Sequence, residues 1–193
     1  MNRRYFIDKI ISSTLFGFSF PLFGFEKNNF KSKKITILHT NDVHSHVDPF
    51  PKEDPINPGG GGVIARAKII NEVKKNNPNT LLLDAGDIFQ GTPYFNFFGG
   101  EIELKLMSKM GYNASTLGNH EFDNGLEKLS KSLKHANFSI INSNYSLKNT
   151  PLENQIKKYE IHVIDGVKIG IFGLGIELEG LVERRLYNGV NYL

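Results

Sequence analysis

Three short polar segments contain the residues of this sequence that are best suited to bind a divalent metal ion. They are Asp42-Val43-His44, Gly86-Asp87 and Gly118-Asn119-His120-Glu121-Phe122-Asp123. Each segment follows an apolar run that is typical of a β-strand. Carboxylate and amide oxygens and imidazole nitrogens are ligands that divalent transition metals accept. The three segments together therefore predict a metal site.

Two divalent ions held close together need hard anionic oxygens and imidazole nitrogens, with one carboxylate shared between them, to activate a water near neutral pH. Asp87, after the middle strand, is the natural shared ligand. Asp42 and His44 lie two residues apart in a loop, so they can approach one ion together, and the amide oxygen of Asn119 can bind the second. A single aspartate after a strand is more often a turn or capping residue, so the prediction depends on the coincidence of three segments.

His120 is predicted to have a different role. If Asn119 faces the metal, His120 faces the substrate, where an imidazolium can stabilise transition-state charge or protonate a leaving oxygen. Asp123, three residues later, can hold the ring in one tautomer and raise its pKa. The alternative is that Asp123 caps the N-terminus of a helix ahead of Leu126, and the two roles are compatible.

Apolar periodicity alternates between strand and helix along the chain after residue 34. Strands are predicted at residues 35–39, 80–83, 114–117 and 138–141, and helices at residues 63–76, 102–110 and 126–133. A hairpin is predicted at residues 159–174, around the turn Asp165-Gly166. This alternation predicts an α/β fold, in which ligands bind beyond the carboxyl ends of the strands.

Composition excludes several other classes of function. The chain has 193 residues, which is enough for one domain with a real core. It has no cysteine, which excludes disulfides, thiolate metal sites and a cysteine nucleophile. The formal net charge is only +3 and the lysines are scattered, which argues against a dedicated nucleic-acid binder.

Residues 1–33 are predicted to be an export signal with a polar spacer. Arg3-Arg4 precede an apolar run from Ile10 to Phe25, as in a twin-arginine signal. The run is short for a membrane span and contains Pro21. We therefore expect export to the periplasm or cell surface, with cleavage of the signal or its retention as an anchor left open. An amphipathic or buried first helix is the alternative.

Read with their flanking residues, the three segments resemble the calcineurin-like metallophosphoesterase superfamily, and within it the bacterial 5'-nucleotidase and UDP-sugar hydrolase family. The resemblance runs from about Lys34 to the last residue, and its motifs are residues 37–46, 83–87, 90–93 and 116–123. It implies a two-sheet sandwich flanked by helices, an exported protein, and two divalent ions, which could be zinc, manganese, iron or cobalt. It also implies that the metal ligands are Asp42, His44, Asp87 and Asn119, and that the catalytic pair is His120 and Asp123.

The resemblance implies a metal-dependent phosphoester hydrolase, most closely a 5'-nucleotidase acting on nucleotides or other phosphomonoesters. A cyclic-nucleotide phosphodiesterase or a UDP-sugar hydrolase is an alternative. The family's later histidines, one of them in a Gly-His-x-His segment, and its second domain are not found in this sequence. We therefore expect residues 34–193 to be the N-terminal part of the catalytic domain, truncated and incomplete, with the second ion weakly held.

An incomplete sandwich leaves an apolar sheet face and a strand edge uncovered, so we expect marginal stability or association. A further alternative is therefore a non-catalytic exported remnant that associates with a partner. Among the other histidines, His39, His135 and His162 are predicted to be structural or on the surface. His46 could approach the site from the loop that carries His44, but no metal is assigned to it.

Overall fold

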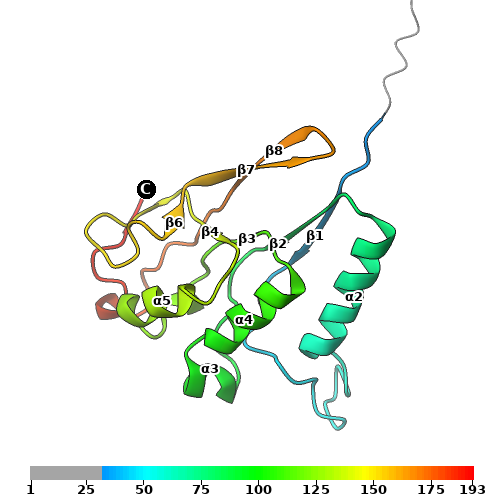
Figure 1. Ribbon diagram of the computed structural model, residues 1–193. Coiled ribbons are helices and arrows are strands. Elements are labelled where there is room, and N and C mark those ends of the chain that lie inside the picture. The colour runs from blue at the N-terminus through cyan, green and yellow to red at the C-terminus, as the bar shows by residue number, and fades with distance from the viewer. Residues whose placement is uncertain (1–31) are drawn as a thin grey trace, which may run out of the picture. The chain divides into compact units, whose positions relative to one another are not determined.

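The computed structural model describes residues 32–193, which form an α/β unit built on one parallel sheet (Figure 1). The sheet has five strands in the order β1-β2-β3-β4-β6, and all neighbouring pairs are parallel. Its strands are β1 (Thr36–Thr40), β2 (Thr80–Asp84), β3 (Ala114–Ser115), β4 (Ser139–Ile141) and β6 (Ile156–Lys157). The predicted α/β class is therefore confirmed. The apolar run predicted to be an export signal lies outside the described residues.

Helical segments connect the first four strands. They are α2 (Gly62–Asn76), α3 (Pro93–Phe98), α4 (Glu101–Met110), the 3-10 turn η1 (His120–Phe122) and α5 (Leu126–Leu133). Helices α2, α4 and α5 were predicted, and α4 ends as expected at Gly111, whose φ of 74° is left-handed. Helix α3 was missed because its six residues are too few to show a helical period. Within residues 32–193, no helix combines the length and apolar character needed to cross a membrane.

The helices lie along one face of the sheet, and the core fills the space between them (Figure 1). Leu82 of β2 and Leu104 of α4 are fully buried there, and so is Phe122 of η1. Burial of one such side chain contributes roughly 1.5–3 kcal/mol. This packing holds β1, β2 and β3 side by side, so that the loops after them begin at one edge of the sheet.

The rest of the chain forms two small antiparallel pairs. One is the predicted hairpin, β7 (Tyr159–Ile164) with β8 (Val167–Phe172), which ends two residues earlier than expected. The other pairs β5 (Tyr145–Ser146) with β9 (Asn191–Tyr192), and the 3-10 turn η2 (Arg184–Leu186) lies between β8 and β9. Of the expected two-sheet sandwich, the described residues thus contain one five-stranded parallel sheet and two separate two-stranded ones.

Candidate metal centre

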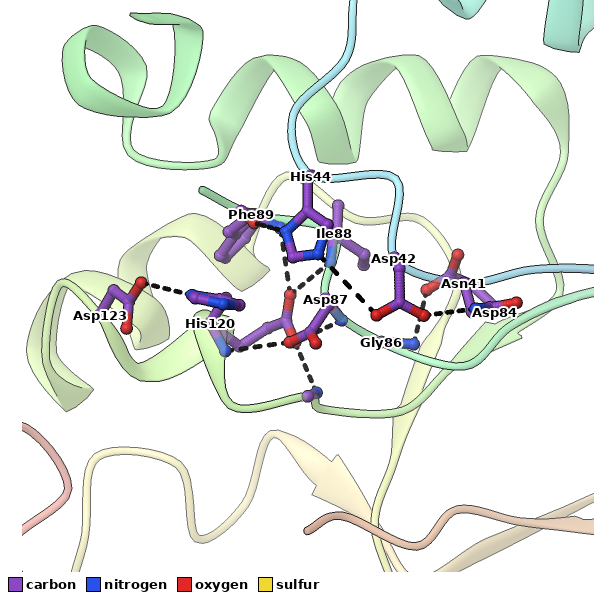
Figure 2. A network of polar contacts seen from close by, with 12 residues as sticks. Asn41, Asp42, His44, Asp84, Gly86, Asp87, Ile88, Phe89, His120 and Asp123 are labelled. Atoms are coloured by element: carbon purple, nitrogen blue, oxygen red, sulfur yellow. Dashed lines mark hydrogen bonds and ion pairs between the residues drawn. The ribbon is translucent and has the colours of Figure 1, made fainter. Parts of the chain in front are cut away.

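The three polar segments follow β1, β2 and β3 at the carboxyl edge of the sheet. Asp42 and His44 come after β1, Asp87 after β2, and Asn119 and His120 after β3. Figure 2 shows the side chains of Asp42, His44 and Asp87 turned toward one another, with the His120 ring beside them. Parallel strands end at the same edge, and this geometry brings residues from distant parts of the sequence together.

Asp42, His44 and Asp87 form a cluster that could hold a metal ion. One ligand atom from each lies within 4.8 Å of the others. His44 Nε2 is 3.8 Å from Asp42 Oδ1, while His44 Nδ1 is 3.3 Å from the backbone oxygen of Phe89. A metal-ligating histidine characteristically uses its other ring nitrogen in such a contact, which fixes the ring. Two carboxylates and one imidazole fit a divalent cation.

Backbone hydrogen bonds hold the first two loops against each other. Asp42 N donates to Gly86 O at 3.0 Å, and His44 N donates to Asp87 O at 3.1 Å. Asp42, His44 and Asp87 all have left-handed backbone conformations, with φ of 51°, 44° and 53°. Such conformations are uncommon for residues with a β-carbon and persist where surrounding contacts hold them. The two loops are therefore shaped by each other.

The third loop joins the cluster through Asp87. His120 N donates to Asp87 Oδ1 at 3.0 Å, and the rings of His120 and His44 meet edge to face with centroids 5.1 Å apart. Asn119 directly precedes this contact, so its backbone lies beside the cluster. At Gly118, a β-carbon would overlap the Asp87 carboxylate, so a larger residue there would displace the carboxylate.

His120 and Asp123 are also in contact. His120 Nδ1 is 2.8 Å from Asp123 Oδ2, which in addition accepts a 3.3 Å hydrogen bond from Gln90 Nε2. Partial burial lowers the pKa of His120, but the hydrogen bond and charge of Asp123, followed by the charges of Asp87 and Glu121, raise it above its usual value overall. The alternative helix-cap role for Asp123 was wrong, because Gly125 is the N-cap of α5.

Glu121 links the loops from behind the cluster, a role that the sequence analysis missed. Its side chain is 2% exposed and accepts backbone hydrogen bonds from Asp87, Ile88, Phe89 and Gly118. Burial and the charge of Asp87 raise the pKa of Glu121 to about 7, against the lowering effect of the backbone donors. In the sequence, Glu121 resembles an ordinary acidic residue at the start of a helical turn. Its apolar neighbour Phe122 is the signal that could have indicated that Glu121 is buried.

Three of the remaining histidines make other contacts. The ring of His46 lies against Phe50, with centroids 4.4 Å apart. His135 Nε2 is 3.6 Å from Glu101 Oε2, and His162 Nε2 is 3.5 Å from Glu160 Oε2. His46 thus shares the loop of His44 but is turned to an aromatic side chain.

Comparisons with known proteins point to one family. The sequence model of the calcineurin-like phosphoesterase family matches residues 35–188. Snake venom 5'-nucleotidase of Gloydius brevicauda is 45% identical over 149 residues, covering 74% of this chain and 25% of that protein. NAD 5'-nucleotidase of Haemophilus influenzae is 40% identical over 152 residues, covering 75% of this chain and 25% of that protein. The chain thus spans about a quarter of the length of these relatives.

Solved structures are similar as well. A 5'-nucleotidase precursor from Thermus thermophilus superposes with a TM-score of 0.71 at 34% identity, covering 82% of this chain and 32% of that one. The NAD nucleotidase of Haemophilus influenzae gives a TM-score of 0.73 at 33% identity, covering 82% of this chain and 29% of that one. With a family match across residues 35–188, this chain belongs to the calcineurin-like phosphoesterase family.

Proposed function

We propose that this chain acts in metal-dependent hydrolysis of phosphoesters, with nucleotides as the substrate class. The observation that carries the proposal is the convergence of Asp42, His44 and Asp87 within 4.8 Å at the edge of the sheet. The relatives named 5'-nucleotidases support the choice of substrate. This chain spans about a quarter of the length of these relatives.

The proposed metal ligands are Asp42, His44, Asp87 and Asn119. Asp42, His44 and Asp87 would hold one divalent ion, and Asp87 with Asn119 would hold a second. Zinc, manganese, iron and cobalt all accept these ligands. Divalent ions in such a site polarise a phosphoryl oxygen and activate a water nucleophile. The second ion would have only two ligands from this chain, so we expect it to bind weakly.

His120 and Asp123 are the proposed catalytic pair. Asp123 engages Nδ1 of the His120 ring at 2.8 Å, which leaves Nε2 as the ring atom that can donate a proton to a leaving oxygen. The hydrogen bond and the charge of Asp123 favour the protonated ring that this role needs. Gln90, which also donates to Asp123, would help to keep the carboxylate in place.

Several phosphoesters are candidate substrates, and their rates of hydrolysis can be compared directly. One relative is named an NAD 5'-nucleotidase, so a dinucleotide is a candidate beside a nucleoside monophosphate. Hydrolysis of cyclic nucleotides or UDP-sugars is the alternative. These reactions share attack at phosphorus, the step for which the cluster is suited, and differ in the group that leaves.

We also propose that the protein is exported, to the periplasm or the cell surface. The support is the pattern of Arg3-Arg4 followed by an apolar run in residues 10–25. One relative is named as a venom protein and another as a precursor, which agrees with this proposal. Fractionation of cells that produce the full chain, with detection of any shortened form, tests it.

The test of the activity is hydrolysis of p-nitrophenyl phosphate, AMP, NAD, a cyclic nucleotide and UDP-glucose, with added Mn²⁺ or Zn²⁺ and after chelation. Phosphate release measures the two phosphomonoesters, and chromatography of the nucleotide products measures the other three. We expect low turnover that depends on metal and falls by roughly 10²–10⁴-fold in His120→Ala. His135→Ala is the matched control, because His135 pairs with Glu101 on the surface. Equal rates for wild type and His120→Ala would remove His120 from the mechanism.

Metal analysis of the purified full chain is an independent measurement. We expect at most one tightly bound ion per chain, because the first site has three ligands and the second has two. Two ions at full occupancy would contradict this ligand count. No bound ion at all under conditions where the chain is folded would contradict the proposed metal site.

A second candidate function is a non-catalytic exported protein that associates with a partner. The observation in its favour is an apolar cavity of about 360 Å³ on the sheet face away from the helices, lined by Ile37, Phe172 and Leu174 among others. These three side chains are 59%, 66% and 61% exposed. Absence of metal-dependent turnover, together with stable association in sedimentation, would favour this function over hydrolysis.

A further inference from the structure

Glu103 is a buried carboxylate that belongs to neither the proposed ligands nor the proposed catalytic pair. It lies on α4, is 5% exposed, and accepts a hydrogen bond from Ser45 Oγ through Oε1. Its other oxygen, Oε2, is buried without a hydrogen-bond partner among residues 32–193. Burial of a carboxylate is unfavourable unless its contacts compensate, so this position calls for an explanation.

Ser45, the partner of Glu103, directly follows His44. It is 1% exposed and has a left-handed backbone with φ of 57°, next to His44 with φ of 44°. Two consecutive left-handed residues with β-carbons are unfavourable without supporting contacts. A change of Ser45 to an ordinary backbone conformation would redirect the chain at His44, so the fixing of Ser45 also fixes His44.

Side chains from two helical segments provide that support. Glu103 holds the Ser45 hydroxyl from α4. Thr92, the residue before α3, places Oγ1 2.8 Å from the backbone oxygen of Ser45 and 3.0 Å from its Oγ. Ser45 N also donates to Ile88 O at 2.8 Å, so the residue is held on its backbone and on its side chain.

A close approach of the second loop completes this arrangement. Gly91, beside Thr92, has φ of 107°, and a β-carbon there would lie 2.7 Å from His44 O and 3.0 Å from His44 Cβ. The His44 loop is therefore enclosed between the Gly91 backbone and the Ser45 contacts with Glu103 and Thr92.

We propose that Glu103, acting through Ser45 with Thr92, is a positioning residue that holds His44 in the geometry needed to bind a metal ion. This inference rests on the proposed function, in which His44 is a metal ligand. Residues that orient a metal-ligating histidine from outside the ligand set typically affect metal affinity by about 10–100-fold. A residue with only a packing role at this position would affect stability and leave the affinity of the folded protein unchanged.

The test is titration of the full chain with Co²⁺, followed by visible absorption, at a temperature where circular dichroism shows every variant folded. We expect Glu103→Leu to lower Co²⁺ affinity about 10–100-fold, because Ser45 loses its acceptor. Glu103→Gln keeps an acceptor oxygen and should restore affinity to within a few-fold of wild type. Glu101→Gln is the matched control, because Glu101 lies on the same helix, is partly exposed and pairs with Lys105.

Ser45→Ala removes the hydroxyl that donates to Glu103, and it tests the inference if Glu103→Leu fails to fold. It should lower Co²⁺ affinity by a similar factor, and the double variant Ser45→Ala with Glu103→Leu should lose no more than either single variant. A folded Ser45→Ala or Glu103→Leu protein with wild-type affinity would overturn the inference. Failure of the wild type to bind Co²⁺ would instead contradict the proposed metal site.

Discussion

At the carboxyl edge of the sheet, polar groups of three loops are bonded to one another, whereas apolar side chains of the hairpin β7–β8 remain exposed. Glu121 alone accepts hydrogen bonds from four backbone N–H groups of these loops. On the hairpin, Ile161, Val163 and Phe172 are 57%, 64% and 66% exposed. The loops of the site are therefore held by directional contacts within the described residues, while part of the apolar surface of these residues is left uncovered.

This difference has a physical reason. A hydrogen bond needs its partner at about 3 Å and in one direction, so the loops specify each other's positions. Apolar contact is not directional and is roughly proportional to the area removed from water, so many complementary surfaces can cover an apolar face. The geometry of the loops can therefore form without a cover on the hairpin.

Asp87→Asn should produce the largest effect at the polar edge. The change keeps the Oδ1 acceptor for His120 N but removes the charge shared by both proposed ions. We expect metal affinity to fall by more than the roughly 100-fold typical of supporting residues, with unchanged stability of the metal-free protein. Calorimetric titration measures the affinity, and Asp165→Asn at the hairpin turn is the control. Wild-type affinity in Asp87→Asn would show that the cluster is not the metal site.

Glu121→Gln should destabilise the fold as a whole. The amide nitrogen of glutamine cannot accept, so two of the four backbone N–H groups lose their acceptor, and we expect a loss of about 3 kcal/mol in the free energy of unfolding. Urea unfolding in the presence of a chelator measures it. Glu127→Gln on the exposed side of α5 should stay within about 0.5 kcal/mol of wild type. A similarly small change for Glu121→Gln would mean that the loops do not depend on this carboxylate.

The double substitution Ile161→Lys with Val163→Lys should weaken self-association and leave the fold stable. Both side chains lie on the exposed face of β7, so we expect unfolding free energy within about 1 kcal/mol of wild type and weaker self-association. Sedimentation velocity measures the association. Lys168→Gln is the control, because Lys168 lies opposite Val163 in the hairpin. A large loss of stability would show that these side chains are packed in the folded chain.

The smallest expected effect is a pH dependence at Asp84. Burial raises the pKa of Asp84 above 3.8, against hydrogen bonds from Thr40, Gly86 and Ser115 and the charge of Arg66. The folded state therefore retains this proton more strongly than the unfolded state, so its contribution to stability is greatest below the unfolded pKa and is lost as pH rises through the folded pKa. Asp84→Asn has no titrating carboxyl at this position, so its stability does not fall in this way as pH rises.

The measurement is urea unfolding of wild type and Asp84→Asn with chelator present, at a series of pH values from about 3 upward. The difference in unfolding free energy should shift in favour of the variant as pH rises above 3.8. A difference that stays constant across the series would contradict the raised pKa.

Much of the fold was predictable because long segments follow one period. The apolar positions of α2 recur at helical spacing, and the hairpin turn Asp165-Gly166 separates two alternating runs. Strand β3, by contrast, was predicted at residues 114–117 and has only Ala114 and Ser115. Thr116 N still donates to Asp84 O, but by Gly118 the backbone packs closely against Asp87, and this tertiary contact overrides local propensity.

The supporting carboxylates were harder to predict than the proposed ligands. Glu103 shares a helical stripe with Met107 and Met110, and a charge in an apolar stripe is a signal that could have marked it as buried. Its partner Ser45 lies far away in the sequence, and no spacing rule connects them. The sequence could therefore point to a buried acid without naming what it holds.

The sequence by itself determined the α/β class, the order of the main elements and the three polar segments, because strand and helix periods and strand-end polar residues are local patterns. Only the tertiary structure decided that Asp42, His44 and Asp87 meet within 4.8 Å and that Glu121 and Glu103 support the loops. The Glu121 contact with Ile88 joins residues 33 positions apart, and the Glu103 contact with Ser45 joins residues 58 positions apart. Both depend on the packing of parallel strands and helices, which no local pattern encodes.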